Sequence, residues 1–230
     1  MKEKKKKFFE DDRQVFAKGL CFDKLFLIFV IGSVIGVYYE QILGFIKAFF
    51  RDGTIFWESR RGLIYGPFNP LYGVAIAAIT YILLKKKRSN LETFAMGSFL
   101  GGGIEYFACL FQELFMGTVS WDYSKKFLNI GGRTTIPFML IWGLLSLLFV
   151  KFVYPYFSKM IEKIPYYIGK VLVFSLIIFF TFDIIISCGA VFRQRLRVSG
   201  VKPLTFIGEF FDEYYPDDLL KKHYPNMKRK

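Results

Sequence analysis

The stretch "LFLIFVIGSVIGVYYEQILGFI", residues 25–46, decides the class of fold. It contains no basic residue, and Glu40 is its only carboxylate. A helix needs about 20 mostly apolar residues to cross the hydrocarbon core of a bilayer. The stretch therefore predicts a membrane-spanning helix. A carboxylate inside such a helix is expected to face the interior of a bundle, because exposing it to lipid is costly.

Further stretches of similar length and apolar character follow along the chain: 63–84, 91–115, 136–154 and 168–192. The whole sequence is 53% hydrophobic and 20% aromatic, with a mean hydropathy of +0.34. This composition lies well above that of an ordinary soluble domain. We therefore expect an all-α, polytopic transmembrane helix bundle with about five spans, located in the cell membrane.

The charge distribution bears on orientation and partners. Residues 1–24 form a basic arm without the apolar core of a signal peptide, so the first span should be retained. With the arm counted on the inner side, the basic residues divide evenly between the two sides of the membrane, 16 on each, and the cluster before the first span then favours a cytoplasmic N-terminus. The net charge of +13 indicates anionic lipid headgroups as partners rather than nucleic acid.

Three features recur in the same order along the chain, which suggests an internal duplication. They are "GSVIGVYYE" (32–40) with "GSFLGGGIE" (97–105), "WES" (57–59) with "WDYS" (121–124), and "PFNPLYG" (67–73) with "PFMLIWG" (137–143). Small residues four apart and interfacial tryptophans are also common in unrelated membrane helices, so each match alone is weak.

The predicted organisation follows from this duplication. Two hairpin repeats, 25–84 and 91–154, precede one extra helix at 168–192, and a polar C-terminal tail covers 193–230. Each repeat has an even number of helices, so the two copies should run parallel, and parallel repeats often build a site where they meet.

Carboxylates inside the spans are the first candidates for a functional site. Glu40 and Glu105 each end a Gly/Ser strip on one helix face, which allows close backbone approach. At about 1.5 Å per residue, these two acids and Asp183 share one depth, just past the midplane. A structural role, in which they pair with arginines to hold the bundle, remains the alternative.

The segment "RRGLIYGPFNPLYG" (60–73) would border this acidic pocket. Irregular backbone is tolerated at membrane depth where it lines a cavity. The alternatives are an ordinary helix start at the interface, or arginines that bind lipid phosphate. Together, the pocket and its flanking loops give these candidate substrate-binding residues: Glu40, Arg61, Asn69, Tyr72, Glu105, Glu113, Trp121, Asp122, Asn129, Arg133 and Asp183.

The sequence lacks the motifs of several enzyme classes. There is no G-x-x-x-x-G-K-[ST], so we expect no P-loop ATPase activity. His223 is the single histidine, and the three cysteines have no metal or redox spacing, so no metal and no cofactor is expected. Acid–base catalysis by buried carboxylates stays open, and no catalytic residue is assigned.

At "RGLIYGPFNPLYG", "WDYS", "NIGGR" and "PFMLIWG" the chain resembles the CmpB-like family of bacterial type IV ABC-transporter permeases. The tail "FFDEYYPDDLLKKHYPNM" (210–227) resembles that of longer members. The resemblance implies a permease subunit that works with a separate ATPase, and a second copy of the chain is a further possible partner. Two alternatives stay open: a membrane enzyme acting on a lipid or lipid-linked substrate, and a scaffold or lipid-binding protein without turnover.

Overall fold

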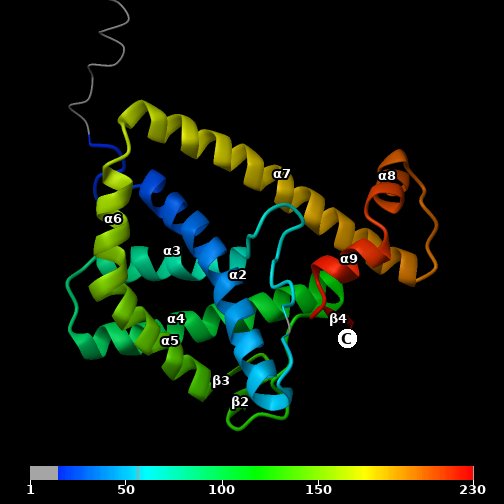
Figure 1. Cartoon of the computed structure of the whole chain (residues 1–230), viewed down its shortest axis with the longest axis horizontal. Coiled ribbons are helices and arrows are strands. Elements are labelled where there is room, and N and C mark those ends of the chain that lie inside the picture. Colours follow the sequence, from blue (N-terminus) through cyan, green and yellow to red (C-terminus); the bar gives the residue numbers. More distant parts are fainter. Residues whose placement is uncertain (1–14, 56, 230) are drawn as a thin grey trace, which may run out of the picture.

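The protein was studied as a computed structural model that describes residues 15–55 and 57–229 (Figure 1). Residues 1–14 of the predicted basic arm lie outside this part. The described chain is mostly helical, with two short two-stranded sheets.

Four helical segments are long and apolar enough to cross a membrane. They are Phe22–Asp52 (α2), Asn90–Met116 (α4, Asn90–Phe111, with the π-turn η1, Gln112–Met116), Ile136–Glu162 (α5, Ile136–Leu148; η2, Phe149–Val153; α6, Tyr154–Glu162) and Tyr166–Val198 (α7). The chain is therefore a helical membrane protein with four candidate spans.

The prediction of a further span at 63–84 was wrong. Helix α3 comprises only Pro70–Leu84, 15 residues, which is about 22 Å of helix against a hydrocarbon core of about 30 Å. The preceding residues close a loop in which the Gly62 amide donates to the Phe68 carbonyl at 2.8 Å. The Asn69 side chain then caps α3, which Pro70 begins.

Glycine allows close packing within each of two helix pairs, α2 with α3 and α4 with α5. A Cβ atom on Gly36 of α2 would lie 2.2 Å from Cγ of Tyr72 on α3. A Cβ atom on Gly101 of α4 would lie 2.3 Å from Cγ of Trp142 on α5. The two rings also contact each other, with centroids 6.2 Å apart, so the pairs meet at these aromatic residues.

A second close contact lies one turn away in each pair. A Cβ on Gly73 would lie 2.2 Å from Oγ of Ser33, and a Cβ on Gly143 would lie 2.2 Å from Oγ of Ser98. Each serine hydroxyl donates to the carbonyl four residues earlier in its own helix, at 2.8 and 2.9 Å. The hydroxyls are thereby satisfied inside the apolar pair.

In Figure 1, helices α2, α4 and α7 run from left to right at different inclinations, and α3 and the α5–α6 segment run from right to left. Glu40, Glu105 and Asp183 each lie a little past the middle of their helix. The α4–α5 connection is a compact segment with β1 (Thr118–Val119), β2 (Asn129–Ile130) and β3 (Thr134–Thr135), in which β2 pairs with β3.

The predicted polar tail is folded. It forms α8 (Phe206–Tyr214), α9 (Asp217–His223) and β4 (Lys228–Arg229), which pairs with β1. Its apolar side chains pack in one cluster with the loop before α3 and with α7: Ile64, Ile186, Ala190, Phe211, Tyr215 and Leu220. Residues from three distant parts of the sequence thus share one core at this end of the molecule.

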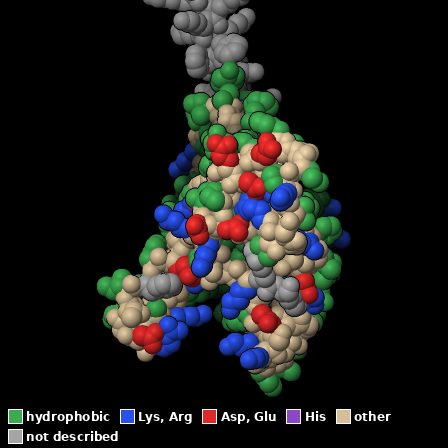
Figure 2. All heavy atoms as spheres, turned by 90° about the vertical axis from the view of Figure 1, so that its right-hand side faces the viewer, with side chains coloured by type: hydrophobic (Ala, Val, Ile, Leu, Met, Phe, Trp, Pro, Cys, Tyr) green, Lys and Arg blue, Asp and Glu red, His purple; other side chains and the backbone are tan. Residues whose placement is uncertain are grey.

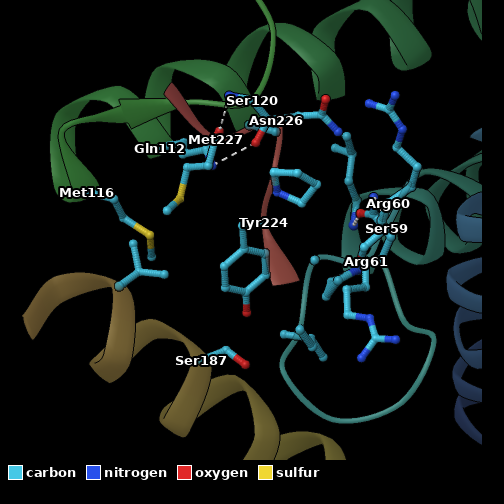
Figure 3. Close-up of a pocket in the computed structure, with 18 of the residues that line it drawn as sticks. Ser59, Arg60, Arg61, Gln112, Met116, Ser120, Ser187, Tyr224, Asn226 and Met227 are labelled. Carbon is cyan, nitrogen blue, oxygen red and sulfur yellow. Dashed lines mark hydrogen bonds between the residues drawn. The ribbon is translucent and has the colours of Figure 1, made fainter. Parts of the chain in front are cut away.

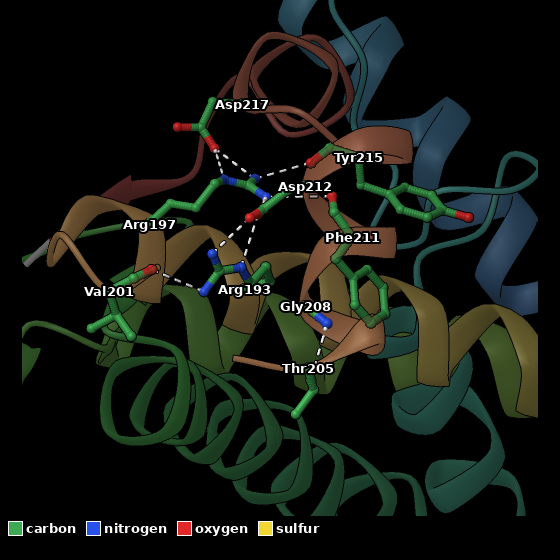
Figure 4. A network of polar contacts seen from close by, with 9 residues as sticks. All are labelled: Arg193, Arg197, Val201, Thr205, Gly208, Phe211, Asp212, Tyr215 and Asp217. Atoms are coloured by element: carbon green, nitrogen blue, oxygen red, sulfur yellow. Dashed lines mark hydrogen bonds and ion pairs between the residues drawn. The ribbon is translucent and has the colours of Figure 1, made fainter. Parts of the chain in front are cut away.

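An ionic network fixes the tail to the end of α7 (Figure 4). Arg193 donates two hydrogen bonds to the Asp212 carboxylate, at 2.8 and 2.7 Å. Arg197 donates to Asp212 at 2.7 Å and to Asp217 at 2.7 and 3.0 Å. These arginines lower the pKa of Asp212 to about 2. The opposite end of the bundle is held by Lys24, which is fully buried and ion-paired with Glu162.

Candidate functional site

The loop before α3 folds against the middle of α7. The Ile64 amide donates to Oγ of Ser187 at 2.9 Å, and the Tyr65 amide donates to Oδ1 of Asp183 at 3.1 Å. The Ser187 hydroxyl also donates to Asp183, at 3.1 Å. Non-helical backbone beside an apolar helix needs partners within the protein, because lipid offers none. Asp183 and Ser187 supply them, which gives Asp183 a structural role in this loop.

A cavity of about 250 Å³ lies between this loop, α2, α4, α7 and the tail (Figure 3). Its lining mixes polar and apolar side chains. The polar and charged residues among those that line it are Glu40, Ser59, Arg60, Arg61, Asn69, Gln112, Ser120, Ser187, Tyr224 and Asn226.

Glu40 provides the carboxylate of this cavity. The Tyr72 hydroxyl donates a hydrogen bond to it. The Arg60 guanidinium lies against Gly44, one turn further along α2, at 3.5 Å from where a Cβ would be, and it pairs with Glu58 at 3.0 Å. Arg60 is close enough to Glu40 to attract it electrostatically. The wall from α2 and the loop therefore carries both signs of charge.

The tail forms another wall. The Ser59 hydroxyl donates to the His223 carbonyl at 3.0 Å, and Nη1 of Arg61 lies 3.3 Å from Nδ1 of His223. Burial, together with the charges of Arg61 and Lys222, lowers the pKa of His223. The Tyr224 ring projects into the middle of the view, with its hydroxyl toward Ser187 (Figure 3). The C-terminal residues thus restrict access to the cavity.

The wall from α4 and η1 is held by side-chain contacts of η1 with the segment that follows it. The Gln112 amide group donates to Oγ of Ser120 and accepts from its backbone amide, both at 2.9 Å. Nε1 of Trp121 donates to the Arg133 carbonyl at 2.8 Å. These bonds place Trp121 at the cavity edge.

Glu105 of α4 and Glu113 of η1 are not among the residues that line the cavity. Glu105 accepts hydrogen bonds from Tyr123 at 3.1 Å and Thr134 at 2.7 Å. Glu113 pairs with Arg133 at 2.7 Å. Burial and the neighbouring Glu105 raise the pKa of Tyr123. The α4–α5 connection therefore covers these two acids.

Two loop candidates shape the same connection. Asp122 accepts from the amide and hydroxyl of Ser124 at 2.9 and 2.5 Å. The Asn129 side chain donates to the carbonyls of Ser124 and Lys126 at 3.2 and 3.0 Å. Such bonds are typical of Asx-type turns, in which the side chain stabilises the local backbone.

The sequence-predicted candidates are thus divided between two places. Glu40, Arg61, Asn69 and Trp121 line the cavity, while Tyr72 bonds to Glu40 and Asp183 lies behind the Ser187 wall. The remaining candidates lie in or under the α4–α5 connection: Glu105, Glu113, Asp122, Asn129 and Arg133. Glu40 and Glu105 are nevertheless close enough to repel each other electrostatically.

Sequence reasoning missed Ser187 and the tail residues 224–227 as parts of the cavity. A signal for Ser187 was present, because residues four apart share a helix face and Ser187 follows Asp183 by four. No comparable signal placed the tail there, since folding back over the cavity depends on tertiary contacts.

A second cavity, of about 330 Å³, is almost wholly apolar and lies between α2, α3, α5, η2 and α6. Gly36, Tyr39, Tyr72, Ile76 and Trp142 are among its lining residues. Because Tyr72 lines this cavity while its hydroxyl reaches Glu40 in the polar one, the Tyr72–Glu40 bond lies between the two. In the described part of the chain, no group of three or more His, Cys, Asp or Glu side chains could hold a metal ion.

Comparison with known families identifies the chain. Residues 27–188 match the family described as "Putative ABC-transporter type IV". The chain belongs to this family. The match covers α2 to the middle of α7 and includes Glu40, Glu105 and Asp183, whereas the tail lies outside it. No match was found among curated proteins or solved structures.

Proposed function

We propose that this protein is the membrane-embedded permease subunit of an ABC-type transporter, and that the polar cavity beside Glu40 binds the transported substrate. The observation that carries the proposal is the position of this cavity, between candidate spans α2, α4 and α7, with a carboxylate and two arginines in its walls. Charged groups within a helix bundle are costly, and in membrane proteins they commonly mark substrate paths.

Family membership and the missing P-loop both support a division of labour in which a separate ATPase supplies the energy. The first experiment is purification of the tagged full-length protein in mild detergent, with identification of bound proteins and lipids. A stoichiometric ATPase, whose ATP hydrolysis rises on reconstitution with this chain, is the expected result. Repeated purification without any ATPase would contradict the permease assignment.

The cavity itself is tested by removing its carboxylate charge. Glu40→Gln keeps the shape of the side chain and should lower substrate-stimulated ATP hydrolysis of the complex by about tenfold, in the range of one lost charged hydrogen bond. Asp218→Asn removes an exposed charge from α9 and serves as the matched control. Equal activity of both variants would exclude Glu40 as a substrate-binding group.

A second candidate function is favoured by the apolar cavity beside the Tyr72–Glu40 bond. An amphipathic ligand could place its polar head near Glu40 and its hydrocarbon part near Trp142, as expected for an enzyme or binding protein for a lipid or lipid-linked molecule. A reproducible co-purified lipid without an ATPase would support it. Loss of a lipid product in Glu40→Gln, with assembly and lipid binding intact, would favour the enzyme over the binding protein.

We also propose that α2–α3 and α4–α5 are copies of one ancestral hairpin. The support is the correspondence of their contacts, Gly36 with Tyr72 against Gly101 with Trp142. The N-terminus is proposed to be cytoplasmic because of the basic residues before α2. Accessibility of a tag placed before residue 15 to an impermeant reagent in intact cells tests this orientation, and labelling from outside would contradict it.

A further inference from the structure

Helix α8 lies beside the last turns of α7. Its Phe211 ring packs on Gly189, where an added Cβ would lie 2.4 Å from the ring. Asp212, the next residue, bonds to Arg193. The apolar run of α7 ends at about residue 192, so α8 is attached at the level where this candidate span leaves its apolar stretch.

The side chains of α8 that face away from α7 are apolar and exposed. Phe206 is 81% exposed, Ile207 66% and Tyr214 58%, and the preceding Leu204 is 89% exposed. Ile207, Phe210 and Tyr214 fall on one helix face, Phe206 lies at the edge of this face, and the exposed Glu209 and Glu213 lie beyond Phe206 on the adjoining face. Besides the face that packs on α7, the helix therefore has an exposed apolar face and an exposed acidic face.

The surroundings of this face indicate what covers it. The neighbouring turns of α7 expose Ile185 and Phe192 near the helix face of Gly189, on which Phe211 packs, so the apolar face of α8 continues the apolar surface of a candidate membrane span. Charged side chains of both signs gather at the same end of the molecule (Figure 2). The apolar surface thus lies at the end of a candidate span, next to charged side chains. This is the arrangement expected at the boundary between acyl chains and headgroups.

We propose that α8 is an interfacial helix that lies in the plane of the membrane, with Phe206, Ile207 and Tyr214 inserted at the headgroup boundary. Glu209 and Glu213 then face water. Because the polar face is acidic, apolar burial holds the helix at the surface, and attraction to anionic lipid contributes little. The Arg193–Asp212 contact sets the height of α8 relative to α7.

The experiment uses the full chain with Cys21, Cys109 and Cys188 replaced by alanine, reconstituted in phosphatidylcholine vesicles. An environment-sensitive fluorophore is attached at Ile207→Cys on the apolar face or at Glu213→Cys on the acidic face. Vesicles with and without a nitroxide-labelled lipid, quenching near the headgroups, are compared. We expect blue-shifted emission and at least about twofold stronger quenching at 207 than at 213.

Equal quenching at the two positions would overturn the proposal. Tyr214→Cys provides a second position on the apolar face and should behave like 207. Quenching at 207 and 214 that rises when the protein is diluted with lipid would also overturn it, since a second copy of the chain would then cover this face. In vesicles that also contain anionic phosphatidylglycerol, emission from 207 that is unchanged between 50 and 500 mM salt, about a threefold change in Debye length, supports apolar attachment.

Discussion

The two helix pairs of this protein share their internal packing but differ in what connects their helices. In both, glycine on the first helix receives an aromatic ring from the second, at Gly36–Tyr72 and Gly101–Trp142. The α2–α3 connection is a loop held by α7, whereas the α4–α5 connection folds on itself with a short sheet. The two pairs thus share a close glycine–aromatic contact and differ in the fold of their connections.

The two connections give Glu40 and Glu105 different surroundings. Glu40 lines the polar cavity because the loop before α3 bends away to α7 and leaves space beside it. Glu105 is covered by Tyr123 and Thr134 of the α4–α5 connection. The two carboxylates therefore have different surroundings because the loops next to them differ.

The largest effect is expected where the pairs are alike. Gly36→Ala and Gly101→Ala each force a methyl group to within about 2.3 Å of an aromatic ring, and overpacking of this kind costs about 1–3 kcal/mol. Thermal unfolding in detergent should show a similar loss for both variants. Gly103→Ala, where no atom lies within 4 Å, is the control and should be neutral or slightly stabilising. A loss in only one of the two pairs would argue against their equivalence.

The next effect concerns the connection that only the first pair has. Asp183→Leu removes the acceptor of the Tyr65 amide and of the Ser187 hydroxyl, which should cost about 1–3 kcal/mol for buried donors left unpaired. Amide hydrogen exchange of residues 62–68 should become faster. Asp183→Asn keeps a carbonyl acceptor and should preserve most of the protection. Full protection in the leucine variant would mean that α7 does not hold the loop.

A smaller effect is expected at the tail, which closes the cavity of the first pair. Asp212→Asn removes the charge shared by Arg193 and Arg197 and should cost about 1 kcal/mol, because part of the carboxylate is exposed to solvent. Limited proteolysis after residue 200 should be faster than in the matched variant Asp218→Asn. Equal cleavage rates would contradict a role of this network in fixing the tail.

The same contact predicts a pH dependence. The pKa of Asp212 is lowered from 3.8 to about 2 by the two arginines, so its stabilising charge is fully present above pH 4. The contribution should be lost as the pH falls from about 4 to about 2. Proteolysis with an acid-active protease should show this loss in the native chain and not in Asp212→Asn.

The smallest effect on stability is expected for Glu105→Gln. The amide oxygen can still accept from Thr134 or Tyr123, so the cost should stay below about 1 kcal/mol. The corresponding Glu40→Gln should also leave stability nearly unchanged, while it lowers substrate-stimulated ATP hydrolysis. If Glu40→Gln and Glu105→Gln reduced substrate binding to the same extent, the proposed functional difference between the two helix pairs would be contradicted.

The sequence by itself determined the class of the protein and most of its helices. The backbone amide and carbonyl groups of a long apolar run need hydrogen-bond partners within the chain when the run lies in a membrane, and a helix provides them. Four of the five predicted spans accordingly correspond to candidate spans in the structure. The motif resemblance likewise pointed to the family that the comparison confirmed. These features depend on local composition and on residue types at fixed spacing.

The tertiary structure alone decided which residues meet. The rise per residue of a helix placed Glu40, Glu105 and Asp183 at a common depth, but depth does not determine which neighbouring element each side chain faces. Which element it faces follows from long-range contacts. The Tyr65 amide of the loop donates to Asp183. The hydroxyls of Tyr123 and Thr134 donate to Glu105. His223 of the tail lies against Arg61. A helix can be predicted from its own residues, whereas a cavity needs the relative positions of elements more than a hundred residues apart.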